Sequence, residues 1–468
     1  MNFYSKFIGD LNETIRGLKR KNSFLQNIAV VFSGNVLSFL LTFFATPIIT
    51  RIYDPAAYGL FAIVNTIAAN ISMVAILGLP EAFVLPKKTR VFQSLVKITF
   101  VGVVAFTMIS GFMVLLADEI IINYFKDDEL ENWLWVIPLC VMLYSMVAIT
   151  GRWIIREKKF RENTIYGLIV NASSKTFVIT FGVITGGYIG GIIFTEILSR
   201  ALMVIGHTFL ILRKSIYSLF FTRINRKQII SDFLMYKKYP LNILPGNFVN
   251  IFSAQIPIYI LPIYGTQLLG NYALAVSLLD IPIRVIGEAI SSVFFQKAAE
   301  LKNHQATEQI KKLTLQTFYK LFFISFLPVC ITVVYGNSIL MFLLGGEQWK
   351  AAGEIAGILG FYYMFRLISS PISSIFNVYG KEKELFYYQI FMFITRILCL
   401  VVPVYVLKLK FLDSMIVYGA GNFLLYFVLT IYIFRICGIG FIKPILITCA
   451  CIIVTLFVMF ASRSIIFL

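Results

Sequence analysis

Long apolar stretches alternate with short polar connections along almost the whole chain. An α-helix of about 20 apolar residues crosses a bilayer core of roughly 30 Å, so each stretch predicts one membrane-spanning helix. Thirteen stretches are expected to span, at residues 27–50, 58–79, 98–117, 133–151, 163–186, 188–212, 240–263, 270–295, 319–343, 353–377, 386–407, 414–435 and 444–462. The pattern predicts an all-α polytopic membrane protein, with twelve spans if the last stretch lies at the membrane surface.

The composition agrees with this class. The chain has 468 residues, of which 59% are hydrophobic and only 14% charged, whereas soluble domains are charged at about 25% of positions. The net charge of +18 invites a nucleic-acid interpretation, but the basic residues lie in short clusters between spans, where membrane topology explains them. The six cysteines and two histidines form no metal-binding pattern. No metal, cofactor or nucleic-acid partner is therefore expected.

The basic residues also orient the chain. Placing the N-terminus in the cytoplasm assigns most of the 41 Lys and Arg residues to inside connections. The outside connections then hold only Arg51, Lys126, Lys350, Lys408, Lys410 and Arg463. Because positively charged loops are retained on the cytoplasmic side, this bias predicts a cytoplasmic N-terminus. The acidic outside turn at 118–131 agrees with that orientation.

Two cytoplasmic segments frame the predicted division of the chain. Residues 1–26 form an amphipathic stretch with a basic end, which indicates an interfacial anchor or a docking helix for a partner protein. Residues 213–239 form the longest connection and separate six spans from seven. We therefore expect an N-lobe at 27–212, a C-lobe at 240–435 and an additional C-terminal helix at 444–462.

A short internal repeat supports two equivalent lobes. In each half, a small-plus-amide pair in the first span is followed, at nearly the same spacing, by a glycine near the start of the next span. The residues are Gly34, Asn35 and Gly59 in the first half and Gly246, Asn247 and Gly270 in the second. Equivalent lobes of membrane transporters meet at a central site, so this repeat predicts a site shared by both halves.

Motifs around the repeat carry a family resemblance. They are Gly34-Asn35, the run Pro-Ile-Ile-Thr-Arg-Ile-Tyr at 47–53, Pro55, and residues 58–62, 254–257, 270–273, Pro282, 286–287, 289–290 and 293–296. As a set they resemble the Wzx-type O-antigen and capsule flippases of the multidrug/oligosaccharidyl-lipid/polysaccharide (MOP) exporter superfamily. The resemblance covers roughly residues 25–436. It implies two six-helix bundles around a central cavity in a bacterial inner membrane.

The same resemblance implies a function. It implies alternating-access transfer of undecaprenyl-pyrophosphate-linked oligosaccharide from the cytoplasmic to the outer leaflet, alongside other polysaccharide-assembly membrane proteins. A drug or cation antiporter of the same superfamily is the nearest alternative, although an anionic interior would suit it better. A membrane oligosaccharide polymerase or ligase would need a larger outside loop than 118–131. The sequence has no Walker motif, and no enzymatic activity is expected.

Ionisable residues interrupt the apolar spans at Lys175, Glu196, Arg200, Asp280, Arg284, Glu288, Arg366 and Arg396. A charge in hydrocarbon costs roughly 2.5–3.5 kcal/mol on insertion scales, so these side chains are expected to face a polar interior. Cations outnumber anions among them. An arginine fork can bond two phosphate oxygens, which suits a pyrophosphate-linked sugar. The substrate-binding candidates are Arg284, Arg366, Arg396, Lys175 and Arg200.

Pairing within a helix is an alternative role for some of these residues. Glu196 and Arg200 stand one turn apart, and Arg284 has a carboxylate one turn away on either side, at Asp280 and Glu288. For Arg200 and Arg284 the sequence leaves pairing and substrate binding open. The other three cations have no opposite charge within one turn and are the stronger ligand candidates. They are Lys175, Arg366 and Arg396.

Other polar groups inside the spans have further candidate roles. The carboxylates Asp280, Glu288 and Glu196 are candidates to bind a coupling H+ or Na+, although a neighbouring arginine would keep the first two ionised. Asn35 and Asn247 are expected to line the cavity, because the repeat places them at equivalent positions in the two halves. Amides of this kind can also hold membrane helices together.

Overall fold

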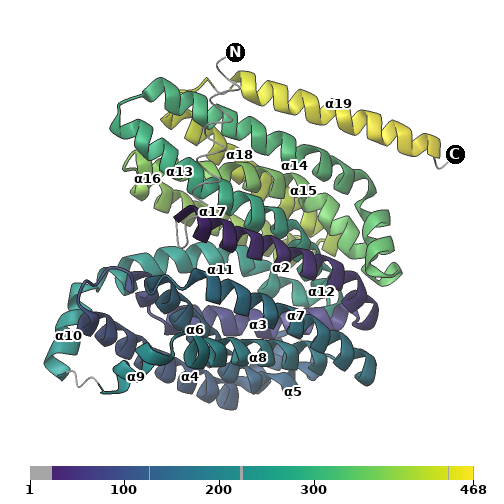
Figure 1. The fold of residues 1–468 in the computed structure, drawn as a ribbon. Helices are drawn as coiled ribbons and strands as arrows, with labels where there is room; N and C mark the ends of the chain where they lie inside the picture. The colour runs from purple at the N-terminus through teal and green to yellow at the C-terminus, as the bar shows by residue number, and fades with distance from the viewer. Residues whose placement is uncertain (1–23, 126, 222–224, 441, 467–468) are drawn as a thin grey trace. The chain divides into compact units, whose positions relative to one another are not determined.

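The computed structural model consists of α-helices joined by short turns (Figure 1). It describes residues 24–125, 127–221, 225–440 and 442–466. The predicted amphipathic stretch at 1–26 lies almost wholly outside these residues. The described ranges contain no β-strand, and 11 of their helices are long and apolar enough to cross a membrane. The predicted all-α polytopic membrane fold is confirmed.

The helices follow one another without interruption by other secondary structure. They are α2 (Phe24–Ile52), α3 (Pro55–Ala75), α4 (Thr89–Phe125), α5 (Glu131–Leu134), α6 (Val136–Arg156), α7 (Phe160–Thr185), α8 (Gly190–Ile205), α9 (Arg213–Phe221), α10 (Arg226–Met235), α11 (Leu244–Ile260), α12 (Thr266–Pro282), α13 (Glu288–Asn303), α14 (Thr307–Leu344), α15 (Lys350–Ile372), α16 (Ile375–Val378), α17 (Glu382–Val401), α18 (Phe411–Ile436) and α19 (Ile442–Ile466). Short 3₁₀ turns lie at Leu79–Ala82, Asp128–Leu130, Leu261–Tyr264 and Glu347–Trp349.

Wider π-helical turns extend four of these helices. They lie at Gly206–Ile211, Tyr239–Ile243, Ile283–Gly287 and Val402–Val406. Proline stands in or directly before three of them, at Pro240, Pro282 and Pro403. Proline has no N–H to donate and its ring crowds the preceding turn, which favours local widening of the helix. Such turns occur often at functional sites because they change where side chains point.

The predicted span at 270–295 is helical throughout but irregular. α12 runs into the π turn at Ile283–Gly287, and α13 continues directly from that turn. This span is not among the helices that qualify by length and apolarity, and it contains three charged residues, Asp280, Arg284 and Glu288. The last predicted stretch forms α19, which packs against α14.

Contacts divide the chain into two compact units. Unit 1 contains Met1–Ile49, Ile67–Asp118 and Trp133–Pro245, and unit 2 contains Thr50–Thr66, Glu119–Asn132 and Gly246–Leu468. Unit 2 thus combines the second half of the chain with two first-half segments at predicted outside ends of spans. α4 departs from helical geometry at Ala117 (φ −127°, ψ 15°), next to the point where the chain passes from unit 1 to unit 2. The lobes at 27–212 and 240–435 stay a prediction.

Unit 1 is organised around α8, which packs against α6 and α7. His207, in the π turn after α8, is 1% exposed, and its Nδ1 lies 2.8 Å from the hydroxyl of Thr150 on α6. Gly34 brings α2 close to α7, since a Cβ there would lie 2.1 Å from the methyl group of Thr164. A small residue is therefore needed at this first position of the predicted repeat.

Unit 2 is organised around α15, which packs against α12, α14 and α18. Glycines permit its closest crossing, because a Cβ at Gly353 would lie 2.5 Å from Cα of Asn337 on α14. Membrane helices use small residues in this way, since lipid provides no hydrophobic drive between helices and tight packing must hold them. α15 therefore forms the centre of unit 2 and contacts polar groups on several neighbours.

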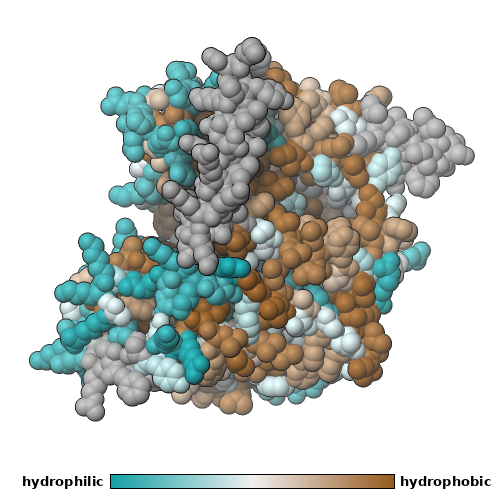
Figure 2. All heavy atoms as spheres, in the orientation of Figure 1, coloured by the Kyte–Doolittle hydropathy of each residue, from teal (hydrophilic) through white to brown (hydrophobic). Residues whose placement is uncertain are grey.

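Hydrophilic and hydrophobic residues are segregated on the surface of each unit (Figure 2). Hydrophobic residues cover the helix flanks, whereas hydrophilic residues gather over α9 and α10 in unit 1 and near α13 in unit 2. The charge bias predicts that both hydrophilic regions are cytoplasmic. The apolar flanks and polar ends are those of a multi-pass membrane protein.

Candidate functional site

Arg396 is a fully enclosed cation in unit 2. It lies on α17 and is only 2% exposed. Its Nε donates to Asn422 Oδ1 at 2.7 Å, its Nη1 to Ser253 Oγ at 2.7 Å and its Nη2 to the Tyr426 hydroxyl at 3.0 Å. These partners belong to α11 and α18. One guanidinium therefore joins three helices through neutral oxygen atoms, and in this conformation its donors are turned toward the protein.

Arg366 has a partner on another helix. Its Nη1 lies 2.8 Å from Asp280 Oδ1, so α15 and α12 are joined by an ion pair. The two side chains are 22% and 29% exposed, and the guanidinium also lies 5.3 Å from the centre of the Tyr363 ring. Asp280, which the sequence offered as a neighbour for Arg284, thus binds Arg366 instead.

Tyrosines fill the space around these two arginines. The ring of Tyr362 on α15 stacks on that of Tyr426 at a centroid distance of 5.6 Å and lies 4.6 Å from the ring of Tyr363. Tyr362 also meets Tyr418 of α18 edge-on at 6.4 Å. Phenol rings provide both an apolar body and a hydroxyl, and here Tyr362, Tyr363 and Tyr418 are buried. The interior of unit 2 is therefore aromatic as well as cationic.

Arg284 and Glu288 differ from these residues because both are exposed. Arg284 lies in the π turn between α12 and α13, and Glu288 begins α13. Among the described residues, neither side chain forms a recorded ion pair or hydrogen bond. The intrahelical pairing considered for Arg284 is therefore not formed, and this arginine remains available to a ligand.

A second charged group lies in unit 1. Arg200 Nε is 2.7 Å from Glu196 Oε1, and the pair is intrahelical on α8. The Arg200 side chain is 41% exposed and lies 5.0 Å from the centre of the Tyr144 ring on α6. Lys175 on α7 is half-buried and interacts electrostatically with the same glutamate. The structure contains the intrahelical ion pair that the pairing alternative describes for Arg200, and Glu196 interacts with two cations.

The repeated amides occupy similar environments. Asn35 on α2 and Asn247 on α11 are both exposed, so their side chains are accessible. Their glycine neighbours differ, because Gly34 is packed against Thr164 whereas a Cβ at Gly246 would lie 3.7 Å from the Phe386 ring, an ordinary contact. The cavity-lining role assigned to the two amides stays a prediction.

The second pair of repeated glycines meets face to face within unit 2. A Cβ at Gly59 would lie 2.1 Å from the carbonyl oxygen of Thr266, and a Cβ at Gly270 would lie 1.7 Å from that of Pro55. Both distances are far inside van der Waals contact. The starts of α3 and α12 therefore touch backbone to backbone, at positions that the repeat makes equivalent.

Further contacts strengthen this junction on the predicted outside. Trp349 is fully buried; its Nε1 donates to the Thr50 carbonyl at 2.9 Å, and its ring meets Tyr58 edge-on at 5.3 Å. Arg51 donates to the carbonyl oxygens of Phe342 and Leu343 at 3.3 and 3.2 Å. The first-half segment Thr50–Thr66 is thus tied to the end of α14 and to the turn before α15.

Sequence reasoning missed the neutral partners of Arg396. Asn422 and Tyr426 stand one helical turn apart in the span at 414–435, a spacing that places two polar groups on one face. The spacing of Asn422 and Tyr426 was visible in the sequence, but only the folded structure shows that this helix face contacts Arg396. Within the described residues, no group of three His, Cys, Asp or Glu side chains is placed to hold a metal ion.

The fold is shared with MOP-superfamily transporters. It matches the structure of "Lipid II flippase MurJ, inward closed conformation" with a TM-score of 0.67 at 14% identity, over 94% of this chain and 93% of that one. It also matches an inward-facing multidrug resistance MATE transporter of the MOP superfamily with a TM-score of 0.61 at 11% identity, over 88% and 98% of the two chains. At such identities the likeness concerns the fold alone.

Sequence similarity assigns the chain to a narrower group than the shared fold does. Residues 48–354 match the family described as polysaccharide biosynthesis protein. This match covers more than half of the sequence, so the chain belongs to that family. A curated relative, the teichuronic acid biosynthesis protein TuaB of Bacillus subtilis (strain 168), is 26% identical over 161 residues, which are 34% of this chain and 32% of TuaB. The match thus spans about a third of that relative.

Proposed function

We propose that the protein flips undecaprenyl-pyrophosphate-linked oligosaccharide repeat units from the cytoplasmic to the outer leaflet of a bacterial plasma membrane. The observation that carries this proposal is the family match at residues 48–354, on a fold shared with a lipid II flippase. The units would serve O-antigen, capsule or another surface polysaccharide. Other polysaccharide-assembly membrane proteins would then use the flipped units, and the N-terminus would lie in the cytoplasm.

The accessible cations are the proposed contacts for the pyrophosphate. Arg284 is exposed and has no recorded ion pair among the described side chains, so its planar fork is free to bond phosphate oxygens. Arg200 and Lys175 share one glutamate, which leaves the unit 1 group net positive. Arg366 is bound to Asp280 and Arg396 to neutral groups. Their part in substrate binding would require these partners to be exchanged.

Alternating access is the proposed mode of transport. The close contact of Gly59 with Thr266 and the burial of Trp349 at Thr50 support a closed junction at the predicted outside. Outward release would require this junction to separate. Gly59→Ala should disturb it, because the new methyl group would meet a backbone carbonyl, whereas Gly167→Ala has open space and serves as the control. The accessibility of cysteine side chains to a reagent added from the outside should rise in Gly59→Ala and stay unchanged in Gly167→Ala.

Ion coupling would involve the intramembrane carboxylates. Asp280 is already engaged in an ion pair with Arg366, whereas Glu288 is exposed. H+ or Na+ coupling is therefore assigned to Glu288 before Asp280 or Glu196. Transport by the Glu288→Gln variant in reconstituted vesicles tests this role. If that transport still responds to an imposed pH or Na+ gradient, Glu288 does not bind the coupling ion.

A deletion strain distinguishes the proposed function from its alternatives. Cells lacking the protein should lose surface polysaccharide and accumulate lipid-linked repeat units in the inner leaflet. Normal polysaccharide with altered drug susceptibility would identify a drug or cation antiporter instead. Repeat units that reach the outer leaflet but are not lengthened or transferred would identify a polymerase or ligase. Complementation with the wild-type chain controls for effects on neighbouring genes.

A further inference from the structure

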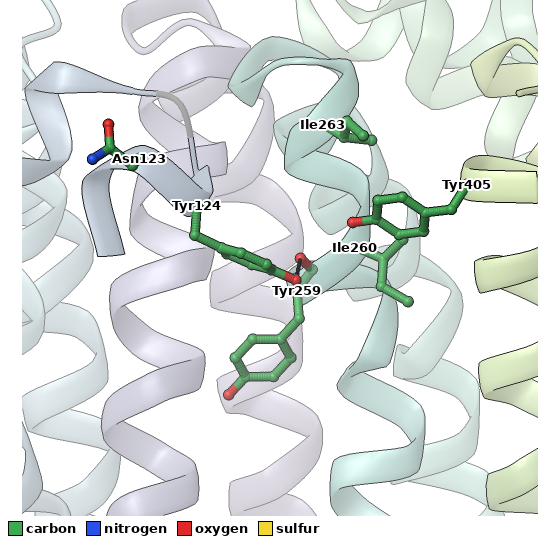
Figure 3. Close-up of a pocket in the computed structure, with 6 residues that line it drawn as sticks. All are labelled: Asn123, Tyr124, Tyr259, Ile260, Ile263 and Tyr405. Carbon is green, nitrogen blue, oxygen red and sulfur yellow. Dashed lines mark hydrogen bonds between the residues drawn. The ribbon is translucent and has the colours of Figure 1, made fainter. Parts of the chain in front are cut away.

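Unit 2 contains an open pocket that the proposed transport site does not use (Figure 3). Its volume is about 250 Å³, and its lining residues are Asn123, Tyr124, Tyr259, Ile260, Ile263 and Tyr405. They come from the end of α4, the end of α11 with the turn after it, and the π turn at Val402–Val406. The three tyrosines and the asparagine thus come from three parts of the chain. The Tyr259 ring turns away from Tyr124 and Tyr405 and lies 5.4 Å from the Phe252 ring, so Tyr259 faces them through its main-chain carbonyl.

The positions of these residues place the pocket at one predicted membrane face. α4 ends at Phe125, within the acidic stretch 118–131, and α11 runs into the turn Leu261–Tyr264. Tyr405 lies shortly before the connection that holds Lys408. The charge bias assigns all three connections to the outside. In the proposed transport direction, a glycan would emerge on this side.

Specific contacts hold the tyrosines in place. The Tyr124 hydroxyl donates to the carbonyl oxygen of Tyr259 at 3.1 Å, which ties the end of α4 to α11. Tyr405 points toward the end of the Tyr124 side chain in Figure 3, and the two phenol groups interact. Pro403 lies in the π turn that carries Tyr405. The altered helical register at this turn aims the ring across the pocket instead of along its own helix.

The lining chemistry selects among ligand classes. The six lining residues include no cation and no carboxylate, so neither a phosphate nor a metal ion is matched. Tyr124 and Tyr405 are 53% and 45% exposed, which leaves ring surface and hydroxyls for a ligand. Sugar rings present C–H faces that pack on aromatic rings and hydroxyls that bond to phenols and amides. A cavity below the roughly 300–1,000 Å³ of typical ligand sites suits one ring.

We propose that this pocket binds a single pyranose ring of the exported glycan after it reaches the outer side. The proposal rests on the proposed function for the identity of the glycan, but not for the sugar binding itself. The pocket would hold the emerging oligosaccharide by one residue and so contribute to glycan selectivity. Tyrosines of an interfacial belt also lie near membrane surfaces, but Tyr124 and Tyr405 line a concave site together with the main chain of Tyr259.

Binding of soluble sugars tests the proposal without transport. The full-length protein, held in a sugar-free amphipol, would be titrated with the methyl glycosides of glucose, galactose and N-acetylglucosamine by saturation-transfer NMR. At least one should bind the wild-type protein, and Tyr405→Ala should weaken its binding by about tenfold, as expected for loss of roughly 1.4 kcal/mol of contact. Tyr217→Ala, at a tyrosine 61% exposed on α9, should bind as the wild type does.

Transport measurements separate this proposal from the proposed function. Tyr405→Ala should slow flipping of the lipid-linked unit that contains the bound sugar and leave thermal stability unchanged. Sugar binding lost without any change in flipping would mean that the pocket takes its sugar from another source, such as a glycolipid headgroup, and would overturn the assignment. Active flipping by a wild-type protein that binds none of the three glycosides would also overturn it, while the proposed function stands. Tyr405→Phe checks for misfolding, since it retains the ring and should lose less affinity.

Discussion

The buried Arg396 and the half-exposed Arg200 represent two ways to place an arginine within a membrane span. Arg396 is 2% exposed and binds three neutral oxygens on two other helices. Arg200 is 41% exposed and pairs with a glutamate on its own helix. Enclosure makes the first arginine part of the packing of unit 2, whereas the second can exchange its partner at small cost. The number of helices that an arginine joins therefore separates a structural cation from an available one.

This difference changes the ranking of candidate residues. The sequence favoured Arg366 and Arg396 as ligands because neither has an opposite charge within one turn. In the structure both are bound by other helices, while Arg284 is exposed and has no recorded partner among the described residues. Arg366 and Arg396, which have no oppositely charged partner on their own helix, thus bind partners on other helices. We now place Arg284 first among the proposed substrate contacts.

The largest expected effect on stability follows loss of Arg396. Arg396→Ala should destabilise the protein by about 3 kcal/mol or more, since a cavity forms and buried polar groups of two other helices lose their partner. The folded fraction in detergent and the midpoint of thermal unfolding should both fall. Arg396→Lys should recover only part of this loss, because an ammonium cannot reproduce the planar fork. A stable Arg396→Ala protein without transport would instead make Arg396 a substrate contact.

Breaking the Arg366 pair should have the next largest effect. Arg366→Ala leaves the Asp280 charge unpaired in a partly buried site, and we expect a loss of about 1–3 kcal/mol, between the values for exposed and buried pairs. A double-mutant cycle with Asp280→Ala isolates the coupling from other effects. The double variant should be more stable than Arg366→Ala alone. A coupling energy of zero in the cycle would show that the ion pair contributes nothing to folding.

The pair on α8 should contribute less to stability. Arg200→Ala should lower stability by only about 0.3–0.5 kcal/mol, the range for exposed pairs one helical turn apart. Transport should nevertheless decrease, since the unit 1 group loses a cation. Flipping assays with matched amounts of folded protein measure the effect on transport independently of the effect on stability. A large drop in the thermal midpoint would place Arg200 with Arg396 among the structural cations.

Arg284→Gln should have the smallest effect on stability and a large effect on transport. The side chain is exposed and has no recorded partner within the described residues, so a change within ±0.5 kcal/mol is expected. Loss of a phosphate contact should reduce surface polysaccharide at normal protein levels. Lys350→Gln, at an exposed cation in a predicted outside connection, is the matched control and should leave polysaccharide unchanged. Normal polysaccharide in Arg284→Gln would remove Arg284 from the substrate site.

By itself the sequence determined the class, the helical segments and the family. Apolar length and 3.6-residue periodicity are local properties of a chain in lipid, where each span must satisfy its own backbone hydrogen bonds. The same local spacing correctly gave the Glu196–Arg200 pair among its alternatives. It also identified Gly59 and Gly270 as equivalent positions, although not that they touch.

Only the tertiary structure decided which side chains meet across helices. Asp280 reaches Arg366, and Ser253 reaches Arg396, because α12, α15, α11 and α17 are rotated and packed in particular ways. Periodicity fixes which residues share a face but not which face a neighbouring helix presents. That choice depends on small-residue crossings such as Gly353 against Asn337 and on proline-associated π turns. These features act between residues far apart in sequence, so local patterns could not foresee the partners.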